Sequence, residues 1–277
     1  MRSSSAAEDK LALLETAPAE GFGFVFAIRT ARAWWYSAWL RTLARFSRTY
    51  FGSFWLGLSN LLSVALLGAV YGAVFNIPNP WEYVVYLGLG YTIWGFISLT
   101  VISACTLFSI RRDQLINNSL PAIFYCLEEW AFQVQTFAQS LVIVMIPILF
   151  IKPVLWLHAL TSVWLPLINV VLFCFWITAL MAVLGSRFKD VAQLMPILMQ
   201  LTFLLSPILY KKEGLGKMAL IADLNPFYRV LAPLRTALID GDVYFRAEFA
   251  TLFVNVILIL IVCYWLKRVR YTMPFWV

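Results

Sequence analysis

Residues 185–210 read GSRFKDVAQLMPILMQLTFLLSPILY, in which three charged side chains stand directly before a long apolar run. The charged residues are Arg187, Lys189 and Asp190, and the apolar run stops at Ser206-Pro207. About twenty apolar residues are enough to cross the hydrocarbon core of a bilayer as a helix. Residues 185–210 therefore predict a membrane span that begins beside a charged aqueous loop.

Further apolar runs of similar length occur along the whole chain. Of its 277 residues, 62% are apolar and 13% are charged, which is far from the composition of a soluble domain. The sequence therefore predicts an all-α integral membrane protein with six transmembrane helices, near residues 54–75, 83–107, 124–151, 160–184, 193–210 and 247–266. Residues 1–23 are polar and lack the apolar core of a signal peptide, so we expect a disordered cytoplasmic tail followed by one transmembrane domain at 24–277.

The positions of Lys and Arg predict how this domain faces. Six spans place both termini on one side, and fourteen of the 21 basic residues fall in the segments on that side. Cytoplasmic segments of membrane proteins carry such an excess, so both termini are expected in the cytoplasm. This topology also accounts for the net charge of +7, and binding to nucleic acid is therefore not expected.

Residues 35–50, before the first span, form an amphipathic pattern. On a helical wheel Arg41, Arg45 and Arg48 share a narrow arc, and aromatic and leucine side chains occupy the opposite side. This pattern predicts a helix that lies in the membrane interface and contacts membrane lipids. Arg29 and Arg32 fall on the apolar side, so the helix either begins after them or bends near them. A simple surface anchor and a contact with a cytoplasmic subunit both fit this segment.

Polar side chains recur within the third predicted span. Glu128, Gln135 and Gln139 share one helical face, and Glu129 and Gln133 form a neighbouring row. Polar groups at membrane depth are costly unless they face protein or water, so both rows are expected to face inward. They could pair with nearby arginines and hold helices together, or they could line a solute path.

Residues 207–246, between the fifth and sixth predicted spans, are too polar to cross the bilayer as one helix. Asn225-Pro226 and Pro233 interrupt a semi-apolar stretch within this segment. Backbone that leaves the helix at membrane depth must be covered by protein or water. The pattern predicts short re-entrant helices within 212–240 on the outer side, with a plain extracellular loop as the alternative.

The sequence contains no motif for catalysis or for binding of a cofactor. It has no GxxxxGK[ST] phosphate loop, no HExxH and no GxSxG, and its four cysteines and single histidine show no metal-ligand spacing. The chain is therefore not expected to be an enzyme or to hold a metal or ATP. Energy for transport would have to come from a partner or from an ion gradient. Aromatic residues make up 17% of the chain, and such rings suit membrane interfaces and the apolar faces of sugars.

Five stretches resemble the permease subunits of ABC transporters that export cell-surface polysaccharides, the Wzm and TagG kind. They are SRTYFGSFWLG (47–57), RRDQLINNSLPA (111–122), SRFKDVAQLMPILMQLTFLLSPILY (186–210), LNPFYRVLAPLR (224–235) and RYTMPFWV (270–277). Two positions depart from the family pattern. Lys189 stands where the family commonly has Arg, and Leu120 precedes Pro121 where an aromatic residue is usual.

The resemblance implies a permease in the bacterial inner membrane that forms a homodimer. Each copy would dock on a separate ATP-binding subunit, which binds ATP and Mg²⁺, so the complex would contain two such subunits. A lipid-linked polysaccharide, such as O-antigen of lipopolysaccharide or a wall polymer, would pass between the two permeases. An exporter of a drug or lipid on the same scaffold is the main alternative. An ion-coupled secondary transporter, with Glu128 or Glu129 as the proton site, is a further one.

The resemblance also implies roles for individual residues. The surface that couples to the ATPase would comprise Arg41, Arg45, Arg48, Arg111, Arg112, Asp113, Gln114, Asn117, Arg187, Lys189 and Asp190. The outer gate would comprise Ser206, Pro207, Tyr210, Asn225 and Pro226. From their places on the first and fifth spans, the residues expected to line the channel are Tyr50, Phe54, Trp55, Gln200 and Phe203.

Overall fold

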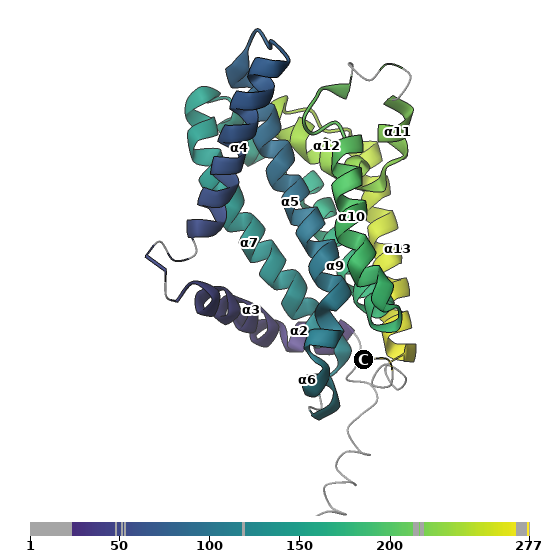
Figure 1. Cartoon of the computed structure of the whole chain (residues 1–277). Coiled ribbons are helices and arrows are strands. Elements are labelled where there is room, and N and C mark those ends of the chain that lie inside the picture. The colour runs from purple at the N-terminus through teal and green to yellow at the C-terminus, as the bar shows by residue number, and fades with distance from the viewer. Residues whose placement is uncertain are drawn as a thin grey trace, which may run out of the picture.

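The computed structural model describes residues 24–47, 49–50, 52, 54–117, 120–212, 216, 219–269 and 276. These residues fold into helices, and no strand occurs among them. Long helices stand side by side, with short helices at both ends of the bundle (Figure 1). The predicted tail at 1–23 and most of the RYTMPFWV stretch lie outside the described residues.

Five helices are long and apolar enough to cross a membrane. They are α4 (Phe54–Val74), α5 (Pro80–Ile110), α7 (Ala122–Ile151), α9 (Trp164–Arg187) and α13 (Phe245–Val269). Each corresponds to one of the predicted spans. The largest difference is at the start of α9, because α8 (Leu155–Thr161) forms a separate short helix before it.

The remaining predicted span, 193–210, is occupied by the shorter helix α10 (Lys189–Leu205). It has 17 residues, and Met199 is its one fully buried side chain. The helix ends at Leu205 because Ser206 is extended, with ψ of 140°, as expected for a residue that precedes proline. The five candidate spans are the long helices, and a sixth crossing of the membrane by α10 stays a prediction.

Two helices precede the first span. The helix is interrupted at Thr30, between α2 (Phe24–Arg29) and α3 (Ala31–Phe46), so Arg29 ends one helix and Arg32 lies in the first turn of the next. The Thr30 hydroxyl donates to the carbonyl of Phe26 at 2.7 Å and closes the last turn of α2. α3 begins before the predicted start at residue 35, ends at Phe46, and lies across the lower part of α7 (Figure 1).

α5 is the central helix, because it packs against α4, α7, α9, α10 and α12. Its closest neighbour is α9, where a Cβ atom on Gly185 would lie 1.9 Å from the backbone oxygen of Cys105. The two backbones therefore touch, which only glycine permits at this position. α4 approaches α7 in a similar way, since a Cβ on Gly57 would collide with the side chain of Ile143.

The two ends of the bundle differ. α6 (Arg112–Asn117) lies at one end with α2 and α3, while α11 (Ala219–Leu224) and α12 (Pro226–Ile239) lie at the other (Figure 1). We refer to these as the α6 end and the α12 end. α11 and α12 fall within the range predicted for short outer helices, and their re-entry into a membrane stays a prediction.

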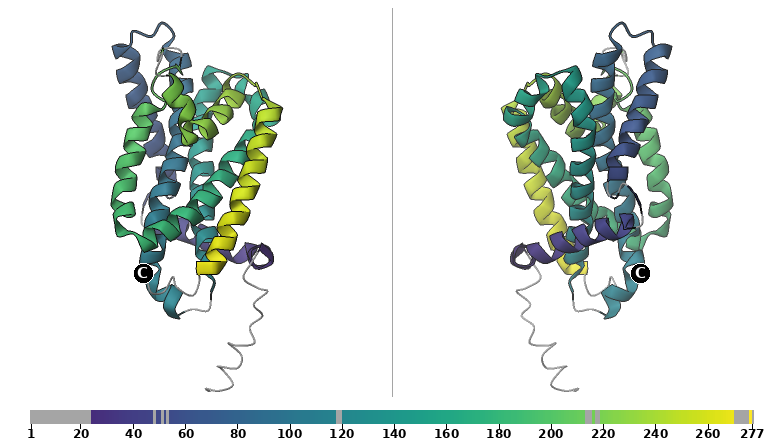
Figure 2. Two further views of the ribbon diagram at one scale, coloured as in Figure 1. Left: turned by 90° about the vertical axis from the view of Figure 1, so that its right-hand side faces the viewer. Right: turned by 90° about the vertical axis from the view of Figure 1, so that its left-hand side faces the viewer.

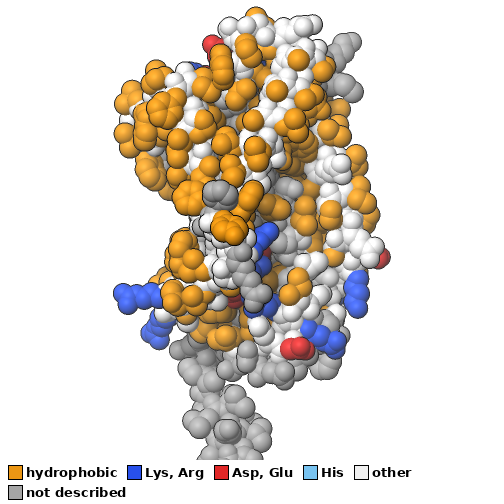
Figure 3. Space-filling model, turned by 60° about the vertical axis from the view of Figure 1, so that its left-hand side comes forward, with side chains coloured by type: hydrophobic (Ala, Val, Ile, Leu, Met, Phe, Trp, Pro, Cys, Tyr) orange, Lys and Arg blue, Asp and Glu red, His pale blue; other side chains and the backbone are white. Residues whose placement is uncertain are grey.

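The surface reflects this polarity. The face in Figure 3 is largely apolar in its upper half, and its Lys and Arg side chains gather in the lower half, toward the α6 end. Figure 2 shows that α4 (dark blue) and α10 (green) lie on the same side of the bundle. Both helices expose many large apolar side chains.

Candidate functional site

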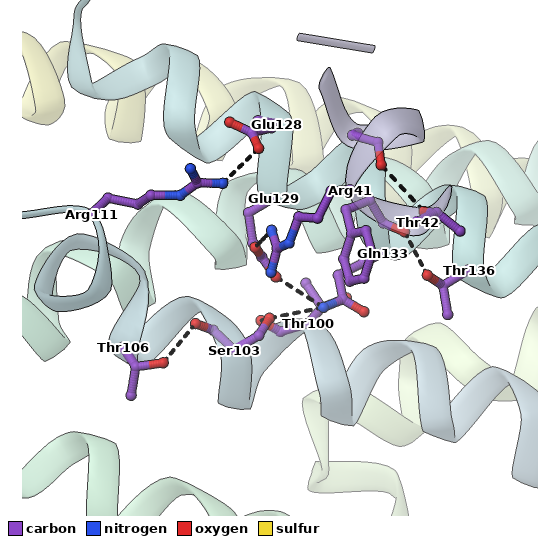
Figure 4. Close-up of polar contacts among 12 residues, drawn as sticks. Arg41, Thr42, Thr100, Ser103, Thr106, Arg111, Glu128, Glu129, Gln133 and Thr136 are labelled. Atoms are coloured by element: carbon purple, nitrogen blue, oxygen red, sulfur yellow. Dashed lines mark hydrogen bonds and ion pairs between the residues drawn. The ribbon is translucent and has the colours of Figure 1, made fainter. Parts of the chain in front are cut away.

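Two adjacent carboxylates of α7 bind arginines from two different elements of the α6 end (Figure 4). Glu129, whose side chain is 2% exposed, pairs with Arg41 of α3. Glu128 accepts from Arg111, which directly precedes α6, at 2.7 Å. Arg111 also donates to the side-chain oxygen of Gln114 in α6 at 2.8 Å. One turn of α7 thus holds both α3 and the start of α6.

A glutamine extends this cluster to α5. The amide nitrogen of Gln133 donates to Glu129 at 2.9 Å and to the hydroxyl of Ser103 at 3.0 Å (Figure 4). The Arg41 guanidinium also lies 4.2 Å from the ring centre of Phe132. Buried charges are tolerated when they are paired and hydrogen-bonded in this way. The cluster therefore joins α3, α5 and α7 at the α6 end.

The other residues predicted to couple to an ATPase are distributed around the same end. Arg112 and Asp113 are exposed on α6, and Lys189 and Asp190 are exposed at the start of α10. Asp190 lies in the first turn of α10, where a negative charge interacts favourably with the helix dipole. Arg187 lies 5.0 Å from the ring centre of Trp276. Arg48 and the side chain of Asn117 lie outside the described residues.

A cavity of about 610 Å³ lies between α4, α5, α7 and α10, and Arg45 of α3 also lines it. Hydroxyl and amide side chains supply the rest of its polar lining: Ser59, Asn60, Ser63, Thr92, Ser98, Gln133, Thr136, Ser140 and Gln200. Aromatic rings supply much of the rest: Tyr91, Trp94, Phe96, Phe137 and Phe203. The cavity can therefore offer both hydrogen bonds and flat apolar surfaces to a solute.

The cavity includes two of the five residues that were expected to line a channel, Gln200 and Phe203. Tyr50 is fully exposed beside the link to α4, and Trp55 is exposed on α4. Phe54 lines a separate groove of about 300 Å³ between α4 and α7. The structure thus places these three aromatic residues away from the cavity.

The polar face of α4 was not predicted, although the sequence contains a signal for it. Ser59, Asn60 and Ser63 recur at spacings of three and four, which places them on one helical face. The amide of Asn60 donates to the hydroxyl of Thr92 in α5 at 3.0 Å. This contact fixes the two polar faces toward each other inside the bundle.

The five polar residues singled out on α7 have different surroundings. Glu128 and Glu129 bind arginines, as one of the two readings of the sequence predicted. Gln135 donates to the backbone oxygen of Trp35 in α3 at 3.1 Å. Gln139 lies in the groove beside Phe54. None of these four lines the cavity, whereas Gln133, from the second row, does.

At the α12 end, α5 holds the segment that follows α10. The Tyr83 hydroxyl donates to the carbonyl of Leu209 at 2.7 Å. The Tyr86 hydroxyl lies 2.9 Å from the carbonyl of Pro207 and 3.1 Å from that of Tyr210. We call residues 206–210 the outer strap. Each of these carbonyls has left the helix, so side-chain donors take the place of the missing backbone donors.

The strap also binds α12. The Asn225 amide donates to the Ser206 hydroxyl at 2.8 Å, while its side-chain oxygen caps α12 by accepting from Phe227 and Tyr228. Pro226 occupies the first turn of α12, where its lack of an N–H costs nothing. The five residues predicted for the outer gate therefore meet at one place.

Tyr210 completes this arrangement. Its hydroxyl donates to the carbonyl of Leu204 at 2.8 Å. Burial raises the pKa of the Tyr210 hydroxyl, with a further contribution from Tyr228. The group therefore stays protonated and keeps its donor role well into alkaline conditions.

A buried arginine at this end was not predicted. Arg235 of α12 is 4% exposed, donates to the Pro207 carbonyl at 2.8 Å, and lies 3.9 Å from the ring centre of Tyr86. The sequence shows Arg235 as the second of two arginines, after Arg229, in the semi-apolar stretch that forms α12. The burial of Arg235 results from the packing of α12 against α5, which the sequence alone does not predict.

No curated protein matches the chain significantly. The family model of the ABC-2 type transporter matches residues 35–239. The matched region runs from within α3 to the last residue of α12, so it contains the paired carboxylates, the cavity and the outer strap. Members of this family are the membrane subunits of transporters that are powered by ATP-binding partner subunits. The chain belongs to the ABC-2 type transporter family.

Proposed function

We propose that this chain is the transmembrane subunit of an ATP-driven exporter of a lipid-linked polysaccharide. Its membership of the ABC-2 type transporter family supports the class of protein and the need for ATP-binding partners. The polar and aromatic lining of the cavity supports the substrate. The paired carboxylates and the outer strap are consistent with this class of protein and with this substrate.

The chemistry of the cavity is the observation that carries the choice of substrate. Sugars present hydroxyl groups at their edges and apolar C–H patches on their faces. The cavity offers amides such as Asn60 and Gln200 for the edges and rings such as Trp94 and Phe203 for the faces. A purely apolar solute would make no hydrogen bonds to this lining, although several of its groups, among them Asn60, Thr92 and Gln133, already bond within the bundle.

A second copy of the chain would complete the path. α4 and α10 border the cavity and lie on the same side of the bundle (Figure 2). Large apolar side chains along α10 are exposed, including Leu194, Ile197 and Leu201. Two copies meeting through these helices would bring two cavities together, so a homodimer provides a wider path than one bundle of this size.

The α6 end would bind the ATP-binding subunits. α3 and α6 lie there, and both connect to α7 through Arg41–Glu129 and Arg111–Glu128. Gln133 contacts Glu129 and also lines the cavity. A movement of α3 or α6 would therefore reach the cavity wall through α7. The excess of basic residues at the α6 end supports the further proposal that this end and both termini lie in the cytoplasm of a bacterium, with the chain in its inner membrane.

The α12 end would then be the exit. The outer strap connects α10, which borders the cavity, to α11 and α12. Release of Tyr83 and Tyr86 from the strap carbonyls would let α12 move away from α5. The outer strap would act in this way as the gate on the far side of the membrane.

A strain that lacks the chain provides the test in cells. We expect it to accumulate a lipid-linked polysaccharide on the cytoplasmic face of the membrane, and the native chain to restore export. The variant Asn60→Leu, which removes an amide from the cavity, is expected to restore export poorly although the protein is present in the membrane. If no glycan accumulates and sensitivity to amphiphilic drugs rises instead, the chain exports a drug or lipid.

A further inference from the structure

Three buried carboxylates occur among the described residues, and their partners differ. Glu128 and Glu129 bind arginines at the α6 end. Glu248, in the first turn of α13, is 4% exposed and forms no ion pair in the part of the chain that the structure describes. A buried carboxylate without a cation is costly as an anion, and a proton commonly neutralises such a group.

Glu248 is one of the few side chains that α13 buries. The buried residues of this helix are Glu248, Asn255, Val262, Leu266 and Val269. The three apolar residues lie in the half toward the α6 end, so only Glu248 and Asn255 are buried in the half toward the α12 end. α13 (yellow) lies at the edge of the bundle, with α9 as its main neighbour (Figure 2). Polar contacts therefore hold much of this half of α13 on α9.

Four residues make these contacts between α9 and α13. The ring nitrogen of Trp176 donates to the side-chain oxygen of Asn255 at 3.0 Å, and the amide of Asn255 donates to the backbone oxygen of Asn169 at 3.1 Å. The amide nitrogen of Asn169 lies 3.0 Å from the backbone oxygen of Glu248 and 2.5 Å from its carboxyl group. The pair of Asn169 and Glu248 is thus the contact closest to the start of α13.

These distances fix the orientation of the Asn169 amide. A backbone carbonyl can only accept a hydrogen bond, so the nitrogen of Asn169 must face the carbonyl of Glu248. The side-chain oxygen of Asn169 is then turned the other way. It is buried and has no donor among the described residues. One hydrogen bond is therefore missing from this contact.

A proton on Glu248 supplies the missing donor. An ionised carboxylate only accepts hydrogen bonds, whereas the neutral acid has an O–H group that can donate to the oxygen of Asn169. The amide and the acid then pair through two hydrogen bonds, one in each direction. The same proton removes the buried charge. The dipole at the start of α13 favours an anion, but weakly compared with the hydration that a buried charge loses.

We propose that Glu248 carries a proton in the folded protein and, as a neutral acid, pairs with Asn169 through two hydrogen bonds that hold α13 on α9. The start of α13 is in this way a proton-dependent contact. The inference does not depend on the substrate, so its failure would leave the proposed function untouched.

The titratable side chains of the two helices that pack on α13 offer Glu248 no cation. Within α9 they are Cys174, in the core of the bundle, and Arg187, at the α6 end. The charged residues of α7 are Glu128 and Glu129, which bind arginines. The other titratable residues of α7 and α13 toward the α6 end are Tyr125, Cys126, Cys263, Tyr264, Lys267 and Arg268.

The titratable groups at the α12 end also have other surroundings. Lys152 and His158 contact the carbonyls of Ile239 and Leu238 in α12. The neighbours of Glu248 along the chain are all exposed: Asp240, Asp242, Tyr244 and Arg246. Glu248 therefore depends on Asn169 for its polar contact.

The proton makes the contact sensitive to pH. In an unfolded chain a glutamate loses its proton at about pH 4.3. Above that pH the folded protein holds one proton more than the unfolded chain, so the contact of α13 with α9 weakens as the pH rises. Residues 240–244 join α12 to α13, so release of the start of α13 would also free the end of α12.

Infrared spectroscopy detects the proton directly, because a carboxylic acid gives a C=O stretching band that an ionised carboxylate lacks. The full-length chain is measured in a detergent without ester groups. We expect the band of the native protein at neutral pH to lose the intensity of one carboxyl group in Glu248→Gln. The matched control is Glu82→Gln, which changes an exposed glutamate in the first turn of α5 and should keep the full intensity.

Glu248→Gln is expected to fold, because an amide donates and accepts at this place as the neutral acid does. A second variant, Asn169→Val, keeps the acid and removes its partner. We expect this variant to shift the acid band to higher frequency, since the carboxyl group then lacks its hydrogen bonds. The two variants thus report on the proton and on its acceptor.

Spin labels show whether the proton holds the two helices together. Ile168 of α9 and Phe249 of α13 are exposed and can carry the labels. We expect a narrow distribution of distances while the acid band is present, and a broad one after a rise in pH has removed the band. In Glu248→Gln the distribution should stay narrow at both pH values.

Three results would overturn the proposal. If neither Glu248→Gln nor Asn169→Val changes the acid region of the spectrum, Glu248 is an anion and water supplies the donor to Asn169. If the acid band persists until the protein unfolds, the contact does not respond to pH. If the band disappears and the distance stays the same, the proton does not hold α13 on α9.

Discussion

Gly185 lies where the backbones of α5 and α9 are in contact. Any side chain at this position must push against the carbonyl of Cys105, and backbone cannot move aside as a flexible side chain can. We expect Gly185→Ala to lower the free energy of unfolding by about 1–3 kcal/mol through overpacking. Thermal unfolding of the purified protein in detergent, followed by intrinsic fluorescence, measures this change.

Gly72 in α4 provides the control for this prediction. A Cβ atom there would meet nothing within 4 Å, and alanine is a better helix former than glycine. Gly72→Ala should therefore unfold at the same temperature as the native protein or slightly higher. Equal effects of the two substitutions would contradict the close contact of α5 with α9.

Arg235 is the residue that joins α12 most directly to the outer strap. Its replacement by Met removes the donor to Pro207 and the cation beside Tyr86 while keeping most of the apolar volume. We expect the amides of Ile208, Leu209 and Tyr210 to exchange with deuterium faster, by about tenfold for a lost bond of about 1.4 kcal/mol. Hydrogen exchange read by mass spectrometry of peptides from this segment measures the change.

Arg229 of the same helix is the control for Arg235. It is exposed, donates to the carbonyl of Asp223 and does not contact the strap. Arg229→Met is expected to leave exchange at residues 208–210 unchanged. If Arg235→Met also leaves it unchanged, the strap is held by α5 alone.

At the scale of elements, the ion pair between Arg41 and Glu129 is one of the contacts that hold α3 against α7. Arg41→Gln leaves the carboxylate of Glu129 buried without a cation and with only neutral partners such as Gln133 and Ser103, and the cost should be about 3 kcal/mol. Glu129→Gln leaves Arg41 partly in solvent, since its side chain is 38% exposed, and should cost clearly less. The double variant should be more stable than Arg41→Gln alone.

The free energy of unfolding for the native protein and these three variants forms a double-mutant cycle. Chemical denaturation in detergent provides the four values. Strictly additive losses would mean that the two side chains do not interact. Equal losses in the two single variants would contradict the difference in their burial.

The elements themselves were largely predictable, because an apolar run of sufficient length leaves few alternatives to a helix. The exception is residues 193–210, where the apolar run continues to Ile208 and Leu209 although Pro207 ends the helix before them. Helix ends depend on such local backbone preferences more than on hydropathy. Charge patterns similarly predicted that the carboxylates of α7 would meet arginines, but not which ones.

The cavity could not be derived from the sequence in the same way. Its wall combines residues of α3, α4, α5, α7 and α10, and the rotation of each helix against its neighbours decides which side chains line it. Phe54 and Phe203 are both aromatic residues on predicted spans, yet only Phe203 lines the cavity. Arg45 and Arg41 share one arc of a helix, yet only Arg45 does so. Only the packing of the helices against one another shows which of these side chains line the cavity.

At the scale of the whole molecule, the paired carboxylates, the cavity and the outer strap follow one another from the α6 end to the α12 end. We predict that the working assembly contains two copies of the chain and two ATP-binding subunits. Native mass spectrometry of the complex, released from detergent, gives this composition directly. A stable and active complex with one copy of the chain would contradict the path between two bundles.

The most direct measurement of the central claim is transport by the purified complex in liposomes. Inside-out proteoliposomes receive ATP and a fluorescent lipid-linked oligosaccharide from outside, and a lectin enclosed in their lumen detects the glycan that has crossed. We predict ATP-dependent crossing of the glycan that Asn60→Leu reduces at least about tenfold, a loss of about 1.4 kcal/mol. Crossing of the lipid carrier alone at the same rate, or full activity of Asn60→Leu, would contradict the claim.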